Sequence, residues 1–151
     1  MGFVISLDCE TTGCDFVHGA MPFLVTWCEV GHNPSFVEWD VDPLTRTPQV
    51  DPSDVAYIAE LLDAADTIYL QGAAFDARAL ATIGVALPWS KVRDTIVASH
   101  ILATNHRHDL TALCIEYLGV DIEPHETHIK EVTRECRKIA KRTNPTWKLA
   151  D

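Results

Sequence analysis

The first residues of the chain constrain its fold more than any other segment. An apolar run, Phe3 to Leu7, leads directly into Asp8 and Glu10, and the segment ends at Thr11-Thr12-Gly13. This pattern predicts a buried β-strand that runs into a turn. Side chains two positions apart on a strand leave the same face, so Asp8 and Glu10 lie side by side while Cys9 points to the opposite face. The chain therefore has to accommodate two adjacent carboxylates at the end of a core strand.

Strand and helix patterns alternate through most of the remaining chain. Further strands are expected at residues 23–30, 36–39, 67–71 and 92–94. Helices are expected from residue 51, from 72 to 84, from 95 to 102, from 108 to 118 and around 129–141. Early hairpins followed by alternating strands and helices predict an α/β fold with a mixed five-stranded sheet, in which a three-stranded antiparallel meander is joined by parallel strands and helices flank the sheet.

Length and composition suit one domain. The chain has 151 residues, 47% of them hydrophobic, which is enough for a core of its own. No shift in composition divides it, so a single domain over residues 1–151 is expected.

The acidic residues of the first strand suggest a metal site when a third carboxylate is added. Asp8 and Glu10 repel each other unless a cation or a proton lies between them, and hard cations such as Mg²⁺ or Mn²⁺ prefer oxygen ligands. Asp76 follows another strand, at the start of a helix. Taken alone, each feature is more simply an ordinary strand-end acid or a carboxylate favoured by the helix dipole. Together, the three carboxylates can form a two-metal cluster.

Four segments, in this order and spacing, resemble the DEDD (DnaQ-like) 3′→5′ exonucleases. Most of all they are similar to the proofreading exonuclease domain of phage-type family A DNA polymerases. The segments are Leu7-Asp8-Cys9-Glu10-Thr11-Thr12-Gly13, Gln71 to Leu80 around Asp76, Arg93 to Leu102 beginning Arg-Asp-Thr, and His108 to Gly119. The resemblance covers roughly residues 3–120.

The resemblance implies a ribonuclease H-like fold and an enzyme that uses two Mg²⁺ or Mn²⁺ ions to remove nucleotides from the 3′ end of single-stranded DNA. It assigns Asp8, Glu10 and Asp76 as catalytic metal ligands. The implied substrate-binding residues are Thr11, Thr12, Phe75 and Arg78. Core packing is the simpler role for Phe75. Asp94 is expected either to support the metal ligands from behind or to be structural, rather than to be a ligand itself.

Two departures from the family pattern bear on activity. Gly72 stands where the second motif normally has an Asn, so weaker substrate positioning is expected. After residue 120 there is no Tyr-x-x-x-Asp or His-x-x-x-x-Asp motif. We expect the domain to be truncated before this third motif. In the alternatives, Trp147 and Asp151 form a degenerate third motif with Asp151 as a catalytic carboxylate, or three carboxylates suffice, or activity has been lost.

The charge distribution separates an acidic body from a basic end. The net charge is −10, which is unusual for a nucleic-acid-binding protein. Residues 129–151, however, hold seven of the twelve Lys and Arg residues. Lys130, Arg134, Arg137 and Lys141 recur at helical spacing and predict an amphipathic helix with a basic stripe. Lys130 and Arg134 are candidate substrate contacts, although a merely solvated face is an equal alternative.

The cysteines and the N-terminus indicate the cell compartment. The five cysteines are scattered without a CxxC pair, which favours reduced thiols over disulfides or a zinc site, and Cys9 is expected to be a buried structural thiol. No signal or membrane-spanning segment is recognised. We therefore expect a cytoplasmic protein, in the bacterial host cytoplasm if phage-encoded, with no membrane partner.

The expected partners are a single-stranded DNA 3′ end and, as a candidate, a DNA polymerase domain or chain. Two other functions remain open. One is a related exoribonuclease, because nothing in the sequence reads a 2′-hydroxyl group. The other is a catalytically incomplete module that binds DNA or a polymerase.

Overall fold

The computed structural model describes residues 2–143, and its contacts divide the chain into two compact units at Leu102–Ala103. The first unit carries the sheet and most of the core. The second unit is helical. The single exonuclease domain expected over residues 1–151 stays a prediction.

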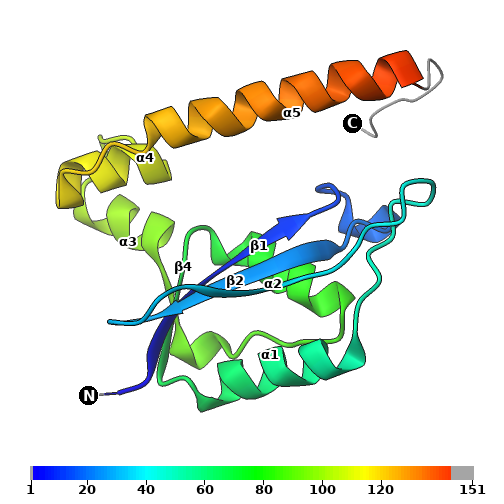
Figure 1. The fold of residues 1–151 in the computed structure, drawn as a ribbon. Coiled ribbons are helices and arrows are strands. Elements are labelled where there is room, and N and C mark those ends of the chain that lie inside the picture. Colours follow the sequence, from blue (N-terminus) through cyan, green and yellow to red (C-terminus); the bar gives the residue numbers. More distant parts are fainter. Residues whose placement is uncertain (1, 144–151) are drawn as a thin grey trace. The chain divides into compact units, whose positions relative to one another are not determined.

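A mixed five-stranded sheet organises the first unit, in the order β3-β2-β1-β4-β5. Strands β1, β2 and β4 are labelled in Figure 1. The central strand β1 (Val4–Thr11) is antiparallel to β2 (Pro22–Glu29), which is antiparallel to β3 (Ser35–Glu38). On its other side β1 is parallel to β4 (Thr67–Leu70), and β4 is parallel to β5 (Val92–Asp94). The predicted meander with added parallel strands is confirmed, as is the α/β fold class.

Burial alternates along β1 as its sequence predicts. Ile5, Leu7 and Cys9 are buried in the core, while the intervening side chains of Asp8 and Glu10 are exposed on the other face. The pairing of β1 with β2 becomes irregular between Glu10 and Thr11, where the strand ends. Because β1 is the central strand, its two acidic residues lie between the antiparallel and the parallel halves of the sheet.

Helices of the first unit supply the rest of the core. Helix α1 (Pro52–Ala64) begins at Asp51, whose side chain accepts a hydrogen bond from the Ser53 N–H, and it buries Ile58 and Leu62. Helix α2 (Ala73–Thr82) follows β4 and contacts β1, β2 and β5. Helix α3 (Thr95–Leu102) continues directly from β5. A 3₁₀ turn, η1 (Phe16–His18), lies between β1 and β2, and a second, η2 (Trp89–Lys91), precedes β5.

The second unit begins with a short helix, α4 (Leu110–Leu113), capped by the Asp109 side chain. It continues as a π-helical segment, η3 (Cys114–Leu118), and ends at Gly119, which is left-handed with φ of 67°. The sequence predicted one helix from 108 to 118 that stops at Gly119. The stop is confirmed. The α-helical geometry after Leu113 is not, because the backbone hydrogen bonds of a π-helix span one residue more than those of an α-helix.

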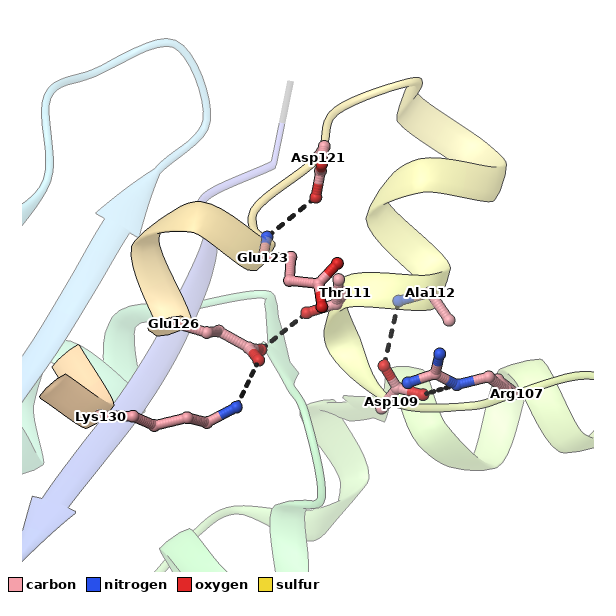
Figure 2. Close-up of polar contacts among 8 residues, drawn as sticks. All are labelled: Arg107, Asp109, Thr111, Ala112, Asp121, Glu123, Glu126 and Lys130. Carbon is pink, nitrogen blue, oxygen red and sulfur yellow. Dashed lines mark hydrogen bonds and ion pairs between the residues drawn. The ribbon is translucent and has the colours of Figure 1, made fainter. Parts of the chain in front are cut away.

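Helix α5 (Glu123–Thr143) is the longest helix and is anchored to α4 by polar contacts (Figure 2). The Thr111 hydroxyl donates to Glu126 Oε1 at 2.7 Å, and Lys130 Nζ donates to Glu126 Oε2 at 3.3 Å. The predicted amphipathic helix is confirmed in position. Among residues 2–143, no helix combines the length and the apolar character that crossing a membrane requires.

Candidate functional site

The carboxylate of Asp76 is tied to the backbone of β1. Asp76 lies in the first turn of α2, is only 2% exposed, and its Oδ1 accepts a hydrogen bond from the Cys9 N–H at 3.0 Å. Because Cys9 stands between Asp8 and Glu10, this bond brings a residue 67 positions away to the acidic end of β1. The three acidic residues predicted from the sequence thus come from two adjoining elements.

The pKa values of all three carboxyl groups are raised above their ordinary values. Burial, and then the negative charge of Asp8, raise the pKa of Asp76 from 3.8 to about 6. Although Asp8 and Glu10 are partly exposed, their partial loss of solvent raises the pKa of both. The Cys9 backbone N–H offsets part of the rise for Asp8, and the charge of Asp8 adds to the rise for Glu10. Asp8 therefore interacts with both of the others, as the central member of the group.

No protein cation neutralises this group in the part of the chain that the structure describes, since the ion pairs found there involve other acids. Clustered carboxylates without a positive partner favour either a proton or an added cation. The donor set consists of carboxylate oxygens, which suits Mg²⁺ or Mn²⁺. As they stand, however, no three His, Cys, Asp or Glu side chains within residues 2–143 are grouped closely enough to hold a metal ion. A bound cation would have to draw the carboxylates together.

The Cys9 thiol makes a side-chain hydrogen bond with Asp76 but is not a candidate nucleophile. It is buried in the core on the opposite face of β1. Burial and the charges of Asp76 and Asp8 raise the pKa of the thiol far above its usual range. A thiol that stays protonated is a poor nucleophile, which agrees with the structural role expected from the sequence.

The Asp94 carboxylate accepts hydrogen bonds from backbone N–H groups. Oδ2 accepts from Ala73 N at 2.8 Å, and Oδ1 accepts from Gly72 N at 3.2 Å and from Ile96 N at 2.9 Å. These contacts agree with the structural role expected for Asp94. Gly72, which replaces the usual Asn, is left-handed with φ of 85° and immediately precedes α2.

The two threonines after Glu10 organise their own loop. The Thr11 hydroxyl donates to Gly13 O at 2.7 Å, and the Thr12 hydroxyl accepts from Met21 N at 3.2 Å. Arg46, whose role the sequence did not reveal, donates from Nη2 to Thr12 O at 2.5 Å. A single basic residue in a loop otherwise rich in Pro, Asp and Thr is the only signal that could have pointed to it.

An aromatic pair joins η1 to α2 beside Asp76. The rings of Phe16 and Phe75 meet edge to face with centroids 5.2 Å apart, and both side chains are half-buried. The Arg78 guanidinium carbon lies 5.7 Å above the Phe16 ring, and Arg78 Nε donates to Ala74 O. Phe75 and Arg78 were predicted substrate contacts. Phe16 was missed because no periodic pattern marks it.

The remaining candidates lie in other parts of the chain. Lys130 and Arg134 are exposed residues of α5 in the second unit, where Lys130 is bound to Glu126. Trp147 and Asp151, the candidates for the third motif, lie outside the described residues.

Comparison with sequence families gives one match over nearly the whole chain. The profile of the family described as 3′-5′ exonuclease matches residues 2–142. No curated protein matches the chain.

Solved structures share the fold at low sequence identity. Brucella melitensis NrnC with bound Mg²⁺ superposes with a TM-score of 0.60 at 21% identity, covering 79% of this chain and 55% of NrnC. The same protein bound to pGG gives 0.58. The POL domain of Pol1 from M. smegmatis, in complex with DNA primer-template and dNTP, gives 0.58 at 17% identity and covers 80% of this chain and 19% of Pol1. The chain thus spans about half the length of NrnC.

Proposed function

Because this chain belongs to the 3′-5′ exonuclease family, of the DEDD type, we propose that it is a nuclease that removes nucleotides from the 3′ end of single-stranded DNA. The observation that carries the proposal is the hydrogen bond from Cys9 N to Asp76 Oδ1, which joins the first and second exonuclease motifs. The resemblance in sequence is thereby accompanied by a hydrogen bond that brings Asp76 of the second motif to the backbone between Asp8 and Glu10 of the first.

In the proposed site, Asp8, Glu10 and Asp76 are the catalytic acids and the metal ligands. Asp8 is the natural shared ligand, since its charge raises the pKa of both Glu10 and Asp76. Asp76 is held rigidly through the Cys9 N–H, whereas Glu10 is at the exposed end of β1 and can adjust. Two bound Mg²⁺ or Mn²⁺ ions supply the activation of a water molecule and the stabilisation of charge on the scissile phosphate.

The substrate end is proposed to lie against the loop after β1 and the first turn of α2. Thr11 and Thr12 shape the loop through their backbone contacts, so their contribution to binding comes mainly from the loop's conformation. Phe75 offers an aromatic surface beside Asp76, and the Arg78 guanidinium supplies a positive charge for phosphate. Lys130 and Arg134 are proposed as further phosphate contacts from the basic stripe of α5, and Asp151 as a fourth catalytic carboxylate.

A second candidate function has the same reaction, removal of nucleotides from a 3′ end, but takes RNA instead of DNA as its substrate. The structural relatives include NrnC bound to pGG as well as Pol1 in complex with DNA primer-template. A related exoribonuclease is therefore the alternative. Polymerase proofreading, a polymerase partner and a phage origin are parts of the same proposal that depend on the DNA assignment. A cytoplasmic location is proposed with either nucleic acid.

A degradation assay tests the proposed function. The purified chain is incubated with Mn²⁺ and a 5′-labelled single strand, supplied in parallel as DNA and as RNA of the same sequence. The wild type is expected to give a descending ladder on DNA, and Asp8→Ala to give none. Asp63→Ala, which removes an exposed acid of α1, is the matched control and should leave the ladder intact.

The alternatives give different patterns in the same assay. A ladder on RNA that is faster than on DNA would favour the exoribonuclease. A wild type that degrades neither strand, yet retains the labelled DNA in a mobility-shift gel, would instead favour a catalytically incomplete binding module.

A further inference from the structure

We propose that Asp94 is a positioning residue, which holds the metal-binding carboxylate of Asp76 in place through the N-terminus of α2. The inference rests on the proposed function for the meaning of the Asp76 site. The inference also states that hydrogen bonds connect β5 to α2 and α2 to β1. This connection can be tested without metal or substrate.

The Asp94 carboxylate joins two helix starts. Towards α2, Oδ2 accepts from Ala73 N at 2.8 Å and Oδ1 accepts from Gly72 N at 3.2 Å. Towards α3, Oδ1 also accepts from Ile96 N at 2.9 Å and Val97 N at 3.3 Å. The carboxylate therefore satisfies four backbone N–H groups that their own helices cannot satisfy.

Helix α2 depends on this external partner. Its N-cap position is Gly72, which is left-handed and makes no side-chain capping bond. A helix start without a side-chain cap leaves its first N–H groups to other acceptors, and Asp94 from the neighbouring strand β5 is the acceptor found here. Glycine lets the chain turn at this point, and Asp94 holds the turn.

The first turn of α2, which Asp94 caps, also carries Asp76 and sets the direction of its side chain. Ala73 and Asp76 are both in the first turn of α2, and Asp76 Oδ1 accepts from Cys9 N at 3.0 Å. Two hydrogen bonds in succession thus connect Asp94 to the backbone between Asp8 and Glu10. If the first bond is lost, the helix start is free to shift and the second should weaken.

Replacing Asp94 by Asn distinguishes two roles of this residue, the positioning of α2 and the capping of α3. The Asn side chain has a single acceptor oxygen and an NH₂ group in place of the second oxygen. With its oxygen directed to Ile96 N and Val97 N, the NH₂ group faces the Ala73 N–H, and two donors cannot bond. Asp94→Asn therefore keeps the α3 cap and the longer bond from Gly72 N, and it breaks the shorter bond from Ala73 N, the first residue of α2.

The experiment compares Asp94→Asn with Asp51→Asn. Asp51 caps α1 in the same unit and accepts from Ser53 N at 2.8 Å, so its variant matches the chemical change away from the site. Amide hydrogen exchange of the metal-free proteins is followed by NMR. We expect the Cys9 amide of Asp94→Asn to exchange roughly three- to tenfold faster than in the wild type, as for the loss of one hydrogen bond, and that of Asp51→Asn to be unchanged.

A Mn²⁺ titration of the same proteins gives the second readout. Asp94→Asn should bind Mn²⁺ about tenfold more weakly, the usual cost of removing a residue that orients a metal ligand, while Asp51→Asn binds as the wild type. Asp94→Ser is the second variant if Asp94→Asn does not fold, because its hydroxyl can cap α3 but is too short to reach Ala73 as well.

Equal Cys9 exchange in the Asp94 and Asp51 variants would overturn the inference, whatever the Mn²⁺ titration gives. If the wild type binds no Mn²⁺ while Cys9 exchange responds to Asp94→Asn alone, the metal assignment fails and the positioning role stands.

Discussion

Asp76 Oδ1 and the backbone N–H of Cys9 are hydrogen-bonded at 3.0 Å, although the two residues are 67 positions apart. The bond brings a buried carboxylate against the central strand between two other acids. Each of those acids has a raised pKa, and no protein cation in the described part of the chain neutralises the group. The stability of the folded protein should therefore depend on pH and on divalent cations.

The stability of the metal-free protein should fall as pH rises from about 4 to 7. The pKa of Asp76 is about 6 in the folded protein and 3.8 ordinarily, so the folded state holds this proton more tightly. The stabilisation is complete below the ordinary value and is lost as pH rises through about 6; it amounts to at most roughly 3 kcal/mol. Urea unfolding in EDTA at several pH values measures it.

Asp76→Asn provides the control for that measurement. Its amide oxygen can still accept from Cys9 N, but it carries no charge and does not titrate. We expect this variant to show a smaller decline and to be more stable than the wild type at neutral pH. The same decline in both proteins would assign the pH dependence to other groups.

Mg²⁺ or Mn²⁺ should raise the melting temperature of the wild type at neutral pH. A cation that binds only the folded state stabilises it by about 2.7 kcal/mol at a hundred times its Kd, which for a domain of this size is a shift of several degrees. Asp8→Asn removes the central carboxylate and should abolish the shift, whereas Asp63→Asn should retain it. A shift that survives in Asp8→Asn would place the cation elsewhere.

Substitutions of Gly72 should follow the preference of the left-handed backbone rather than side-chain size. A Cβ at this position would meet only Ile96 Cδ1, at an ordinary contact distance of 3.4 Å, so space is not limiting. We expect Gly72→Ala to lose roughly 1–2 kcal/mol because φ is 85°, and Gly72→Asn to lose less because Asn tolerates this conformation. Thermal unfolding ranks the two variants, and an Ala variant as stable as the wild type would contradict the argument.

Thr111→Val should loosen the start of α5. The Thr111 hydroxyl is buried and donates to Glu126 Oε1, and this bond is the largest cause of the lowered pKa of Glu126 (Figure 2). Valine keeps the volume and removes the donor, at a cost of about 1 kcal/mol. Amides of the first turns of α5 should exchange faster, while those of β1 in the first unit should not change. Thr127→Val, on an exposed position of α5, is the control.

The arrangement of the first unit was largely predictable because each strand carries its own local signal. The alternation from Phe3 to Glu10 predicted both β1 and the face on which Asp8 and Glu10 lie, since burial on one face repeats every second residue. The expected strand at 23–30 is observed as Pro22–Glu29, displaced by one residue. Asp51-Pro52-Ser53 predicted the start of α1 through its capping chemistry.

The contacts that assemble the site were less predictable because they join residues without a common period. Phe16 and Phe75 come from a turn and a helix, and Arg46 reaches Thr12 across 34 residues. Sequence patterns report burial and local backbone preference, not which loop folds against which. The π-helical segment after Leu113 was also missed, since its residues carry the same apolar spacing as an α-helix.

The separation of Cys9 from the acidic face of β1 has a practical chemical consequence. Thiolates are the species that attack alkylating reagents, and the raised pKa and burial of Cys9 leave it almost entirely as thiol. Cys14 and Cys136 are exposed by contrast. A maleimide dye should therefore couple to these outer thiols and spare Cys9. In a Cys136→Ser variant, a fluorophore on Cys14 then becomes an optical reporter of the loop next to the acids, without chemical change at the strand that bears them.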